Sequence, residues 1–201
     1  MSLPTTYSIQ LPSWVEGEAA TADLSTDEGK MELVNRLARR NFKEKTGGPF
    51  AAIVVENGRL ISAGVNLVLA SGLSGSHAEV VALGLAQTAV GSWDLGADGA
   101  RRELIVNWRP CVQCYGATMW SGVTRLVVAG DGPELERLTK FDEGPMVADW
   151  AAQFEARGIS VTQDVLREQA LDVYREYGEF VAAGDVTVYN ARGAGAIDKP
   201  E

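Results

Sequence analysis

The amino-acid sequence predicts an α/β protein, a three-layer α/β/α sandwich around a five-stranded mixed sheet. Short apolar strands alternate with helical segments, which is the pattern of a sheet covered by helices on both faces. Asn57-Gly58 lies between two apolar runs and favours a tight antiparallel hairpin at the start of the sheet. Of the 201 residues, 46% are apolar and 22% are charged, so the composition is that of a globular chain and not of a disordered one.

The chain is expected to form one domain with an extension at each end. Residues 1–24 are rich in Pro, Thr, Ser and Ala and form an N-terminal extension without a sustained period. Residues 25–183 carry all the periodic segments and form the domain. Residues 184–201 form a C-terminal tail of mostly small residues with one strand-like piece, VTVY. We find no internal repeat and no second domain.

The first predicted helix is capped by Ser25 or Thr26 and runs to about Lys45, with apolar residues at helical spacing. Gly47-Gly48-Pro49 ends it. The elements that follow are the hairpin strands 51–56 and 59–65, a helix over 77–90, a strand over 103–107, a helix over 111–120, a strand over 125–129, an acidic loop, a helix over 146–157, a strand over 159–163 and a helix from the capping residue Asp164 to 181. A helix between the last two strands predicts that these strands run parallel.

Charge and composition exclude several classes of protein. With 18 Lys and Arg against 27 Asp and Glu, the net charge is −9, which disfavours a protein that neutralises nucleic-acid phosphates. No window approaches the roughly 18 apolar residues of a membrane span. The start of the chain lacks the basic and apolar segments of a secretory signal. We therefore expect a cytoplasmic protein.

Three residues must carry any soft-metal chemistry, because His77 is the single histidine and Cys111 and Cys114 are the two cysteines. Cysteines three apart at a helix N-terminus share one face, and the helix dipole there favours thiolates. A histidine at the start of the neighbouring helix can complete a zinc site with ligand distances of about 2.0–2.3 Å. Alone, the cysteines could be a redox pair or chance. The combined H-x-E…P-C-x-x-C pattern is far more specific, and it is the pattern of zinc nucleobase deaminases.

The number of ligands indicates the kind of zinc site. A structural zinc ion usually has four Cys or His ligands, whereas three protein ligands leave a position for water, which is the catalytic arrangement. Glu79 lies two residues after His77 and can act as the proton carrier beside that position.

From Gly48 to about Ile159 the chain resembles the zinc-dependent cytidine deaminase superfamily, through GGPFAAIVV, HAE, PCVQC and MWSGVTRLVVA. More narrowly, FDEGP at 141–145, EARGI at 155–159 and YNAR at 189–192 resemble the bacterial guanine deaminases of this fold. The resemblance implies one Zn²⁺ per subunit, bound by His and two Cys. Arg109 is a departure, because the family usually has Glu before Pro-Cys, but this residue is not a ligand.

The resemblance also implies a set of substrate-binding residues. Asn66 would hydrogen-bond the purine, the backbone of Ala78 would contact the base, and Phe50 would wall the pocket or simply pack in the core. Glu143, and with it Asp142 of the same loop, would recognise the guanine edge or carry protons to the leaving amine. Tyr189 belongs to a tail segment that closes over the active site, often that of the partner subunit.

The function expected from these observations is a zinc-dependent hydrolytic deaminase of a free purine base, which converts guanine to xanthine and ammonia. Its partners would be a small nucleobase and a second copy of the chain in a homodimer, with a swapped tail as one possibility. The alternatives are a deaminase of cytosine, a nucleoside or an aminotriazine such as ammeline, a tRNA-adenosine deaminase, which the acidic charge disfavours, and a zinc-stabilised interaction domain. Trp108 and Trp120 are expected to pack in the core.

Overall fold

A computed structural model describes residues 3–190 and 193–194. Its main sheet has the strand order β2-β1-β3-β4-β5. The strands are β1 (Ala51–Glu56), β2 (Arg59–Val65), β3 (Arg102–Val106), β4 (Arg125–Val128) and β5 (Ser160–Thr162). β1 pairs antiparallel with β2 and β3, and β3, β4 and β5 run parallel, so the predicted mixed sheet is confirmed.

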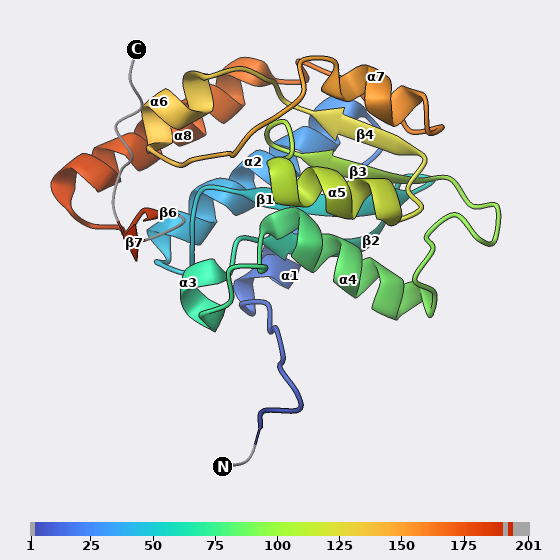
Figure 1. Cartoon of the computed structure of the whole chain (residues 1–201), viewed down its shortest axis with the longest axis horizontal. Coiled ribbons are helices and arrows are strands. Elements are labelled where there is room, and N and C mark those ends of the chain that lie inside the picture. The colour runs from blue at the N-terminus through green and yellow to red at the C-terminus, as the bar shows by residue number, and fades with distance from the viewer. Residues whose placement is uncertain (1–2, 191–192, 195–201) are drawn as a thin grey trace.

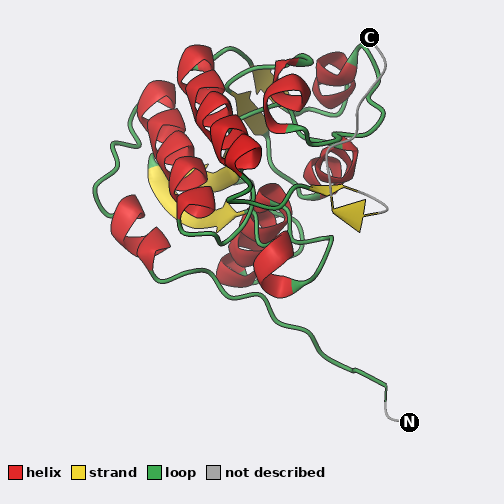
Figure 2. Ribbon diagram, turned by 90° about the vertical axis from the view of Figure 1, so that its left-hand side faces the viewer, coloured by secondary structure: helices red, strands yellow, loops and turns green. Residues whose placement is uncertain are grey.

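Helices cover both faces of this sheet (Figures 1 and 2). They are α1 (Trp14–Ala19), α2 (Asp27–Lys43), α3 (Val68–Ser71), α4 (Ala78–Val90), α5 (Val112–Trp120), α6 (Glu134–Thr139), α7 (Trp150–Glu155) and α8 (Arg167–Ala183). In Figure 1, α4 and α5 cross in front of the sheet and α2 runs behind it. A small second sheet pairs β6 (Tyr189–Asn190) with β7 (Gly193–Ala194).

The inner strand β1, between β2 and β3, shows why the chain folds as three layers. Ala51, Ile53 and Val55 face the core beneath α2 and α8, while Ala52 and Val54 face the core beneath α4. Successive side chains of a strand point to opposite faces, so an uninterrupted apolar run supplies both cores at once. The sheet therefore holds α4 and α5 rigidly on one face and α2 on the other.

Several elements differ from those expected. The short helix α1 lies inside the predicted extension, and α6 lies inside the predicted acidic loop, where Leu135 is buried. Both have six residues, too few for a helical period to stand out. The helix expected over 146–157 is reduced to α7, since residues 146–149 form no helix. The tail strand is β6 and not VTVY.

Two further expectations were wrong for local reasons. Asp164 does not cap α8: Asp164 and Leu166 both have positive φ, and the helix begins only at Arg167. Trp120 is 83% exposed at the end of α5, whereas Trp108 is buried as predicted. At the start of the domain, Thr26 is the residue that caps α2, since its side chain accepts a hydrogen bond from Gly29 N at 3.1 Å.

Among the described residues, no helix is long and apolar enough to cross a membrane.

Candidate metal centre and active site

The three predicted metal ligands meet where α4 and α5 begin. His77 and Cys111 are the residues immediately before the two helices, and Cys114 lies one turn into α5. Their ligand atoms all lie within 4.8 Å of one another, and Cys111 Sγ is 3.4 Å from His77 Nδ1. Ligands of a tetrahedral zinc ion lie roughly 3.5 Å apart. The donor set and its spacing fit zinc, so the structure brings the three predicted ligands together where they could hold a metal ion.

The pKa values of the two cysteines bear on the binding of a cation. Hydrogen bonds from Cys114 and His77 lower the pKa of Cys111 to about 4, so this sulfur is a thiolate at neutral pH. Burial raises the pKa of Cys114 well above its ordinary value. Because a bound cation stabilises thiolates, binding of zinc at this point is coupled to loss of the Cys114 proton.

Glu79 and Glu143 are two buried carboxyl groups beside these ligands. Glu79 is in the first turn of α4, and burial away from water, with the Cys111 thiolate nearby, raises its pKa to about 7. Burial, Cys111 and Glu79 together raise the pKa of Glu143 to about 8. Strongly perturbed carboxyl groups that share a cavity are typical of catalytic sites.

The Glu143 backbone is fixed on both sides. Its N–H donates to Glu136 Oε1 at 3.1 Å, and its carbonyl accepts from Val112 N at 3.2 Å. These bonds tie the loop 141–145 to α6 and to the first turn of α5. The loop therefore carries Glu143 to the metal ligands from a part of the chain with no regular structure.

A cavity of about 370 Å³ joins these groups. Its walls contain nearly all of the predicted site residues: His77, Cys111, Glu79, Glu143, Asn66, Phe50, Asp142 and Tyr189. Cys114 lies behind Cys111, fully buried. Ala78 is also fully buried and is not part of the wall. Its carbonyl lies against β2, where a Cβ on Gly64 would come within 2.3 Å of it.

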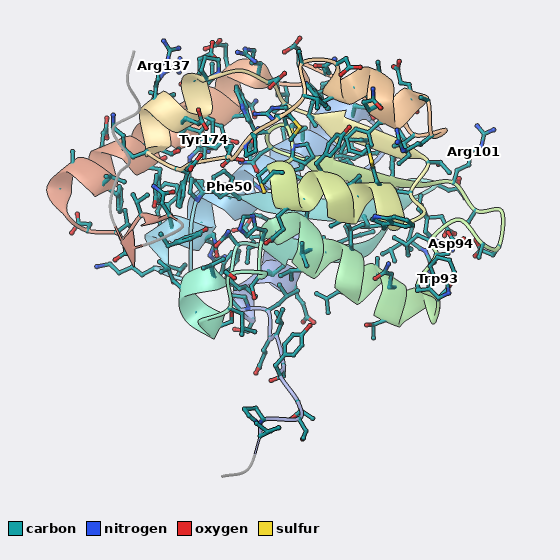
Figure 3. All side chains as sticks on the ribbon, in the orientation of Figure 1. Phe50, Trp93, Asp94, Arg101, Arg137 and Tyr174 are labelled. Carbon is teal, nitrogen blue, oxygen red and sulfur yellow. The ribbon has the colours of Figure 1, made fainter. Side chains whose placement is uncertain are left out.

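Asn66 and Phe50 form one wall of the cavity. Asn66 is 1% exposed, and its Oδ1 accepts a hydrogen bond from Val68 N at 3.2 Å. The amide nitrogen is therefore the end of this side chain left to donate to a ligand. Phe50 packs edge-on against Phe141 at 5.2 Å and near Tyr174, so it lines the cavity and packs in the core (Figure 3).

The tail also lines the cavity, through Tyr189 and Asn190. The Tyr189 ring lies 4.8 Å from the Phe141 ring, and the Tyr189 hydroxyl is buried without a hydrogen-bond partner among the residues that the structure describes. Asn190 accepts from Asp142 N and donates to Lys140 O, both at 2.9 Å. The tail thus closes over the cavity of its own chain. The last two residues of the YNAR motif, 191 and 192, lie outside the described residues.

Sequence reasoning gave no ligand-binding role to several residues of the wall. They include Trp108, Arg109, Val112 and Gln113, which flank the Pro-Cys motif on both sides. Their closeness in the sequence to Cys111 is the one signal that could have indicated a place in the cavity wall. Arg109, the departure from the family pattern, forms an ion pair with Asp131 at 2.5 Å, so its positive charge is compensated beside the cavity.

Residues 24–130, just over half of the chain, match the family described as the cytidine and deoxycytidylate deaminase zinc-binding region. The chain belongs to this family. The five-stranded sheet is accordingly a cytidine deaminase-like fold, and the protein is a zinc-dependent deaminase, a hydrolase.

Known proteins place the chain near one branch of the family. It is 30% identical over 132 residues to the guanine deaminase of Bacillus subtilis, covering 66% of this chain and 81% of that protein. It is 35% identical over 111 residues to the tRNA-specific adenosine deaminase of the same organism, covering 55% of this chain and 66% of that protein. The solved guanine deaminase from Nitrosomonas europaea is 40% identical with a TM-score of 0.81, covering 89% of this chain and all of that chain.

Proposed function

We propose that this protein deaminates a free purine base, converting guanine to xanthine and ammonia. The observation that carries the proposal is the single cavity in which two buried carboxyl groups, Glu79 and Glu143, face a three-ligand metal site and the amide donor of Asn66. The similarity to two guanine deaminases supports the choice of base.

The reaction needs one group that moves protons. Zinc held by His77, Cys111 and Cys114 would lower the pKa of a bound water to about 7 and so supply the nucleophile. Glu79 would accept one proton from the attacking water and pass it to the purine ring nitrogen, and would then accept the proton of the newly added hydroxyl and pass it to the departing amine, so that it acts as general base and general acid in turn. Its pKa near 7 suits both roles.

Asn66, Phe50 and Glu143 of the cavity wall would recognise the base. The Asn66 amide donates to an acceptor of the purine, and Phe50 contacts its apolar face. Guanine presents two adjacent donors, N1–H and the exocyclic amine, and the ionised Glu143 can accept from both. Zinc held by its three ligands would lower the pKa of Glu143 and so favour its ionised form. Adenine offers a bare ring acceptor at that place, so the carboxylate would be left unpaired. Glu143 could also carry the proton to the leaving amine.

A substrate panel tests this proposal. Zinc-loaded enzyme would be assayed for ammonia release from guanine, adenine, cytosine, cytidine, guanosine, ammeline and a tRNA anticodon stem-loop. Guanine should be deaminated far faster than the other substrates. Comparable rates on cytidine, or release from the tRNA alone, would move the assignment to one of the alternatives. Zinc bound without any ammonia release would favour the interaction domain.

A homodimer is part of the proposal, and the outer face of α4 and α5 supports it. The one charged residue in these two helices, Glu79, is buried, so a chain of charge −9 can meet its copy there without repulsion. Gly84 and Gly116 lie inside the helices, where glycine costs about 1 kcal/mol, and a Cβ on either would meet no atom within 4 Å. A second backbone could approach closely at both.

Two exposed tryptophans extend this face. Trp93 and Trp120 are 77% and 83% exposed, and their segments are joined by a hydrogen bond from Leu95 N to Ser121 O. Trp93 projects beyond the end of α4 in Figure 3. Gly116→Glu should convert a dimer into a monomer in light scattering. Gly17→Glu, at an equally open helix glycine on α1, should not. A wild-type monomer would refute the dimer.

We also propose that residues 25–183 form the deaminase domain and that residues 184–201 form a tail that closes over an active site. Deleting residues 184–201 should reduce turnover much more than zinc content, because Tyr189 and Asn190 close the cavity. Exchange of the tail between subunits predicts that a tail-deleted chain mixed with a Glu79→Gln chain regains activity, since only an exchanged tail can close over an intact Glu79. No recovery would mean that each tail serves its own chain.

We further propose a cytoplasmic location. Cys111 and Cys114 are both free, and thiols that serve as metal ligands persist in a reducing compartment.

A further inference from the structure

Asn41 of α2 is a buried side chain that reaches two separate segments of the cavity wall. Its Nδ2 donates to the Gly48 carbonyl and to the Asn66 carbonyl, both at 2.8 Å. Gly48 lies two residues before Phe50, and Asn66 follows β2. Asn41 itself is fully buried and does not line the cavity. One amide group therefore joins the two segments that carry the ring and the donor of this wall.

The orientation of the Asn41 amide follows from its partners. A flipped amide would point its oxygen at two carbonyl oxygens, so the nitrogen must face them. Asn41 Oδ1 is buried and has no hydrogen-bond partner among the described residues, which is costly. The side chain bears this cost while its nitrogen satisfies two acceptors at once. Its role therefore lies with the donor end.

The backbone around Asn41 is packed so that these bonds can form. A Cβ on Gly47 would lie 2.0 Å from the Asn66 carbonyl oxygen and 3.1 Å from Asn41 Nδ2, so only glycine fits at position 47. Two further bonds continue the connection. Asn66 N donates to Phe50 O at 3.0 Å, and Val68 N donates to Asn66 Oδ1. These hydrogen bonds connect α2, through Asn41, to both the backbone and the side chain of Asn66.

We infer that Asn41 is a positioning residue, which holds Asn66 in the orientation that binds the purine. The inference rests on the proposed function. Asn41 touches neither the substrate nor the metal ligands, so it acts only through Asn66 and, through Gly48, on Phe50. A site whose donors are held in place before the substrate arrives spends no binding energy on ordering them.

Asn35 provides a matched control. It is also a buried asparagine of α2, and neither polar atom of its side chain has a hydrogen-bond partner among the described residues. Asn35→Ala and Asn41→Ala remove the same atoms from the same helix. Any general loss of packing should appear in both variants, whereas only Asn41→Ala releases the cavity wall.

The test is a double-mutant cycle with guanine as substrate. Asn41→Ala should lower kcat/KM by about tenfold, as expected for losing two buried hydrogen bonds that orient a binding group. In an Asn66→Ala background, where the positioned amide is gone, the further loss should be under about threefold. Asn35→Ala should leave kcat/KM within about twofold. Equal losses from Asn41→Ala in both backgrounds would mean a merely structural role and overturn the inference.

A second measurement does not depend on the substrate. Hydrogen exchange should become faster at the Asn66 and Val68 amides in Asn41→Ala and stay unchanged there in Asn35→Ala. Unchanged exchange in both variants would overturn the inference even if guanine is a substrate. Wild-type enzyme without activity on guanine would refute the proposed function alone, and the exchange data would still decide the role of Asn41.

Discussion

The two ends of the parallel strands contain the same kinds of ionisable groups in opposite surroundings. At the start of β3 and β4, Glu103 and Asp27 are paired with cations. Lys30 Nζ lies 2.5 Å from Glu103, and Arg125 contacts both carboxylates. Hydrogen bonding to Arg125 lowers the pKa of Asp27. At the other end of the strands, Glu79 is buried without a Lys or Arg partner in the described part of the chain, and burial raises its pKa to about 7.

This difference separates a structural network from a functional site. Ion pairs at the start of the strands stabilise the folded state, and each charge there is already compensated by its partner. At the site end, the two carboxyl groups and the two thiols lie close together, with no Lys or Arg ion pair to the carboxyl groups among the described residues. Folding therefore raises the pKa values of Glu79, Glu143 and Cys114. Cys111 is the group that carries the negative charge. A bound divalent cation would lower the pKa values of these groups. The carboxyl groups at this end of the sheet could then give up protons and take them back near neutral pH.

The largest effect is expected from removing the proton carrier at the site end. Glu79→Gln should lower guanine turnover by about 10³-fold or more, because the amide can no longer accept and return protons. Zinc content should be unchanged, since His77, Cys111 and Cys114 remain. The thermal midpoint should stay equal or rise, because a buried carboxyl group near a thiolate is removed. Retention of most turnover with zinc bound would mean that another group carries the protons.

A smaller loss is expected at the second buried carboxyl group. Glu143→Gln should lower kcat/KM for guanine by about 10- to 100-fold, since an amide oxygen accepts more weakly and its NH₂ opposes a donor of the base. Asp142→Asn is the matched control on the same loop. Its side chain is exposed and its Oδ1 accepts from Gly144 N, a bond that asparagine keeps. Equal effects of the two variants would contradict a special role for Glu143.

The metal site could be predicted from the sequence because so few residues could form it. One histidine and two cysteines at two helix starts leave almost no choice, and the structure brings all three together. Glu143 and Tyr189 were reachable only through resemblance to a family. Their loops have no periodic pattern, and they reach the cavity through bonds such as those of Asn190 to the 140–142 backbone.

Asn41 marks the limit of sequence reasoning. It is one of two buried asparagines of α2, and no sequence motif tells it apart from Asn35. Its partners are 7 and 25 residues away in the sequence. Trp120 shows the converse: a large apolar residue predicts burial within one chain, but it lies on a face that we assign to a second copy.

The smallest effect is expected at the paired end of the strands. Asp27→Asn should destabilise the protein by about 1–2 kcal/mol at neutral pH, which corresponds to a thermal midpoint lower by about 3–6 °C. Glu28→Gln, an exposed acid in the same first turn of α2, controls for the helix dipole and should change it much less. The folded pKa of Asp27 lies below its ordinary value of 3.8, so the stability from its ionised form is present above pH 3.8 and is lost as the pH falls through the lower, folded pKa. The gap between wild type and Asp27→Asn in urea midpoints should therefore close in acid, measured at each pH with the Glu28→Gln control. A gap that persists unchanged below pH 3 would mean that the charge of Asp27 does not stabilise this end of the sheet.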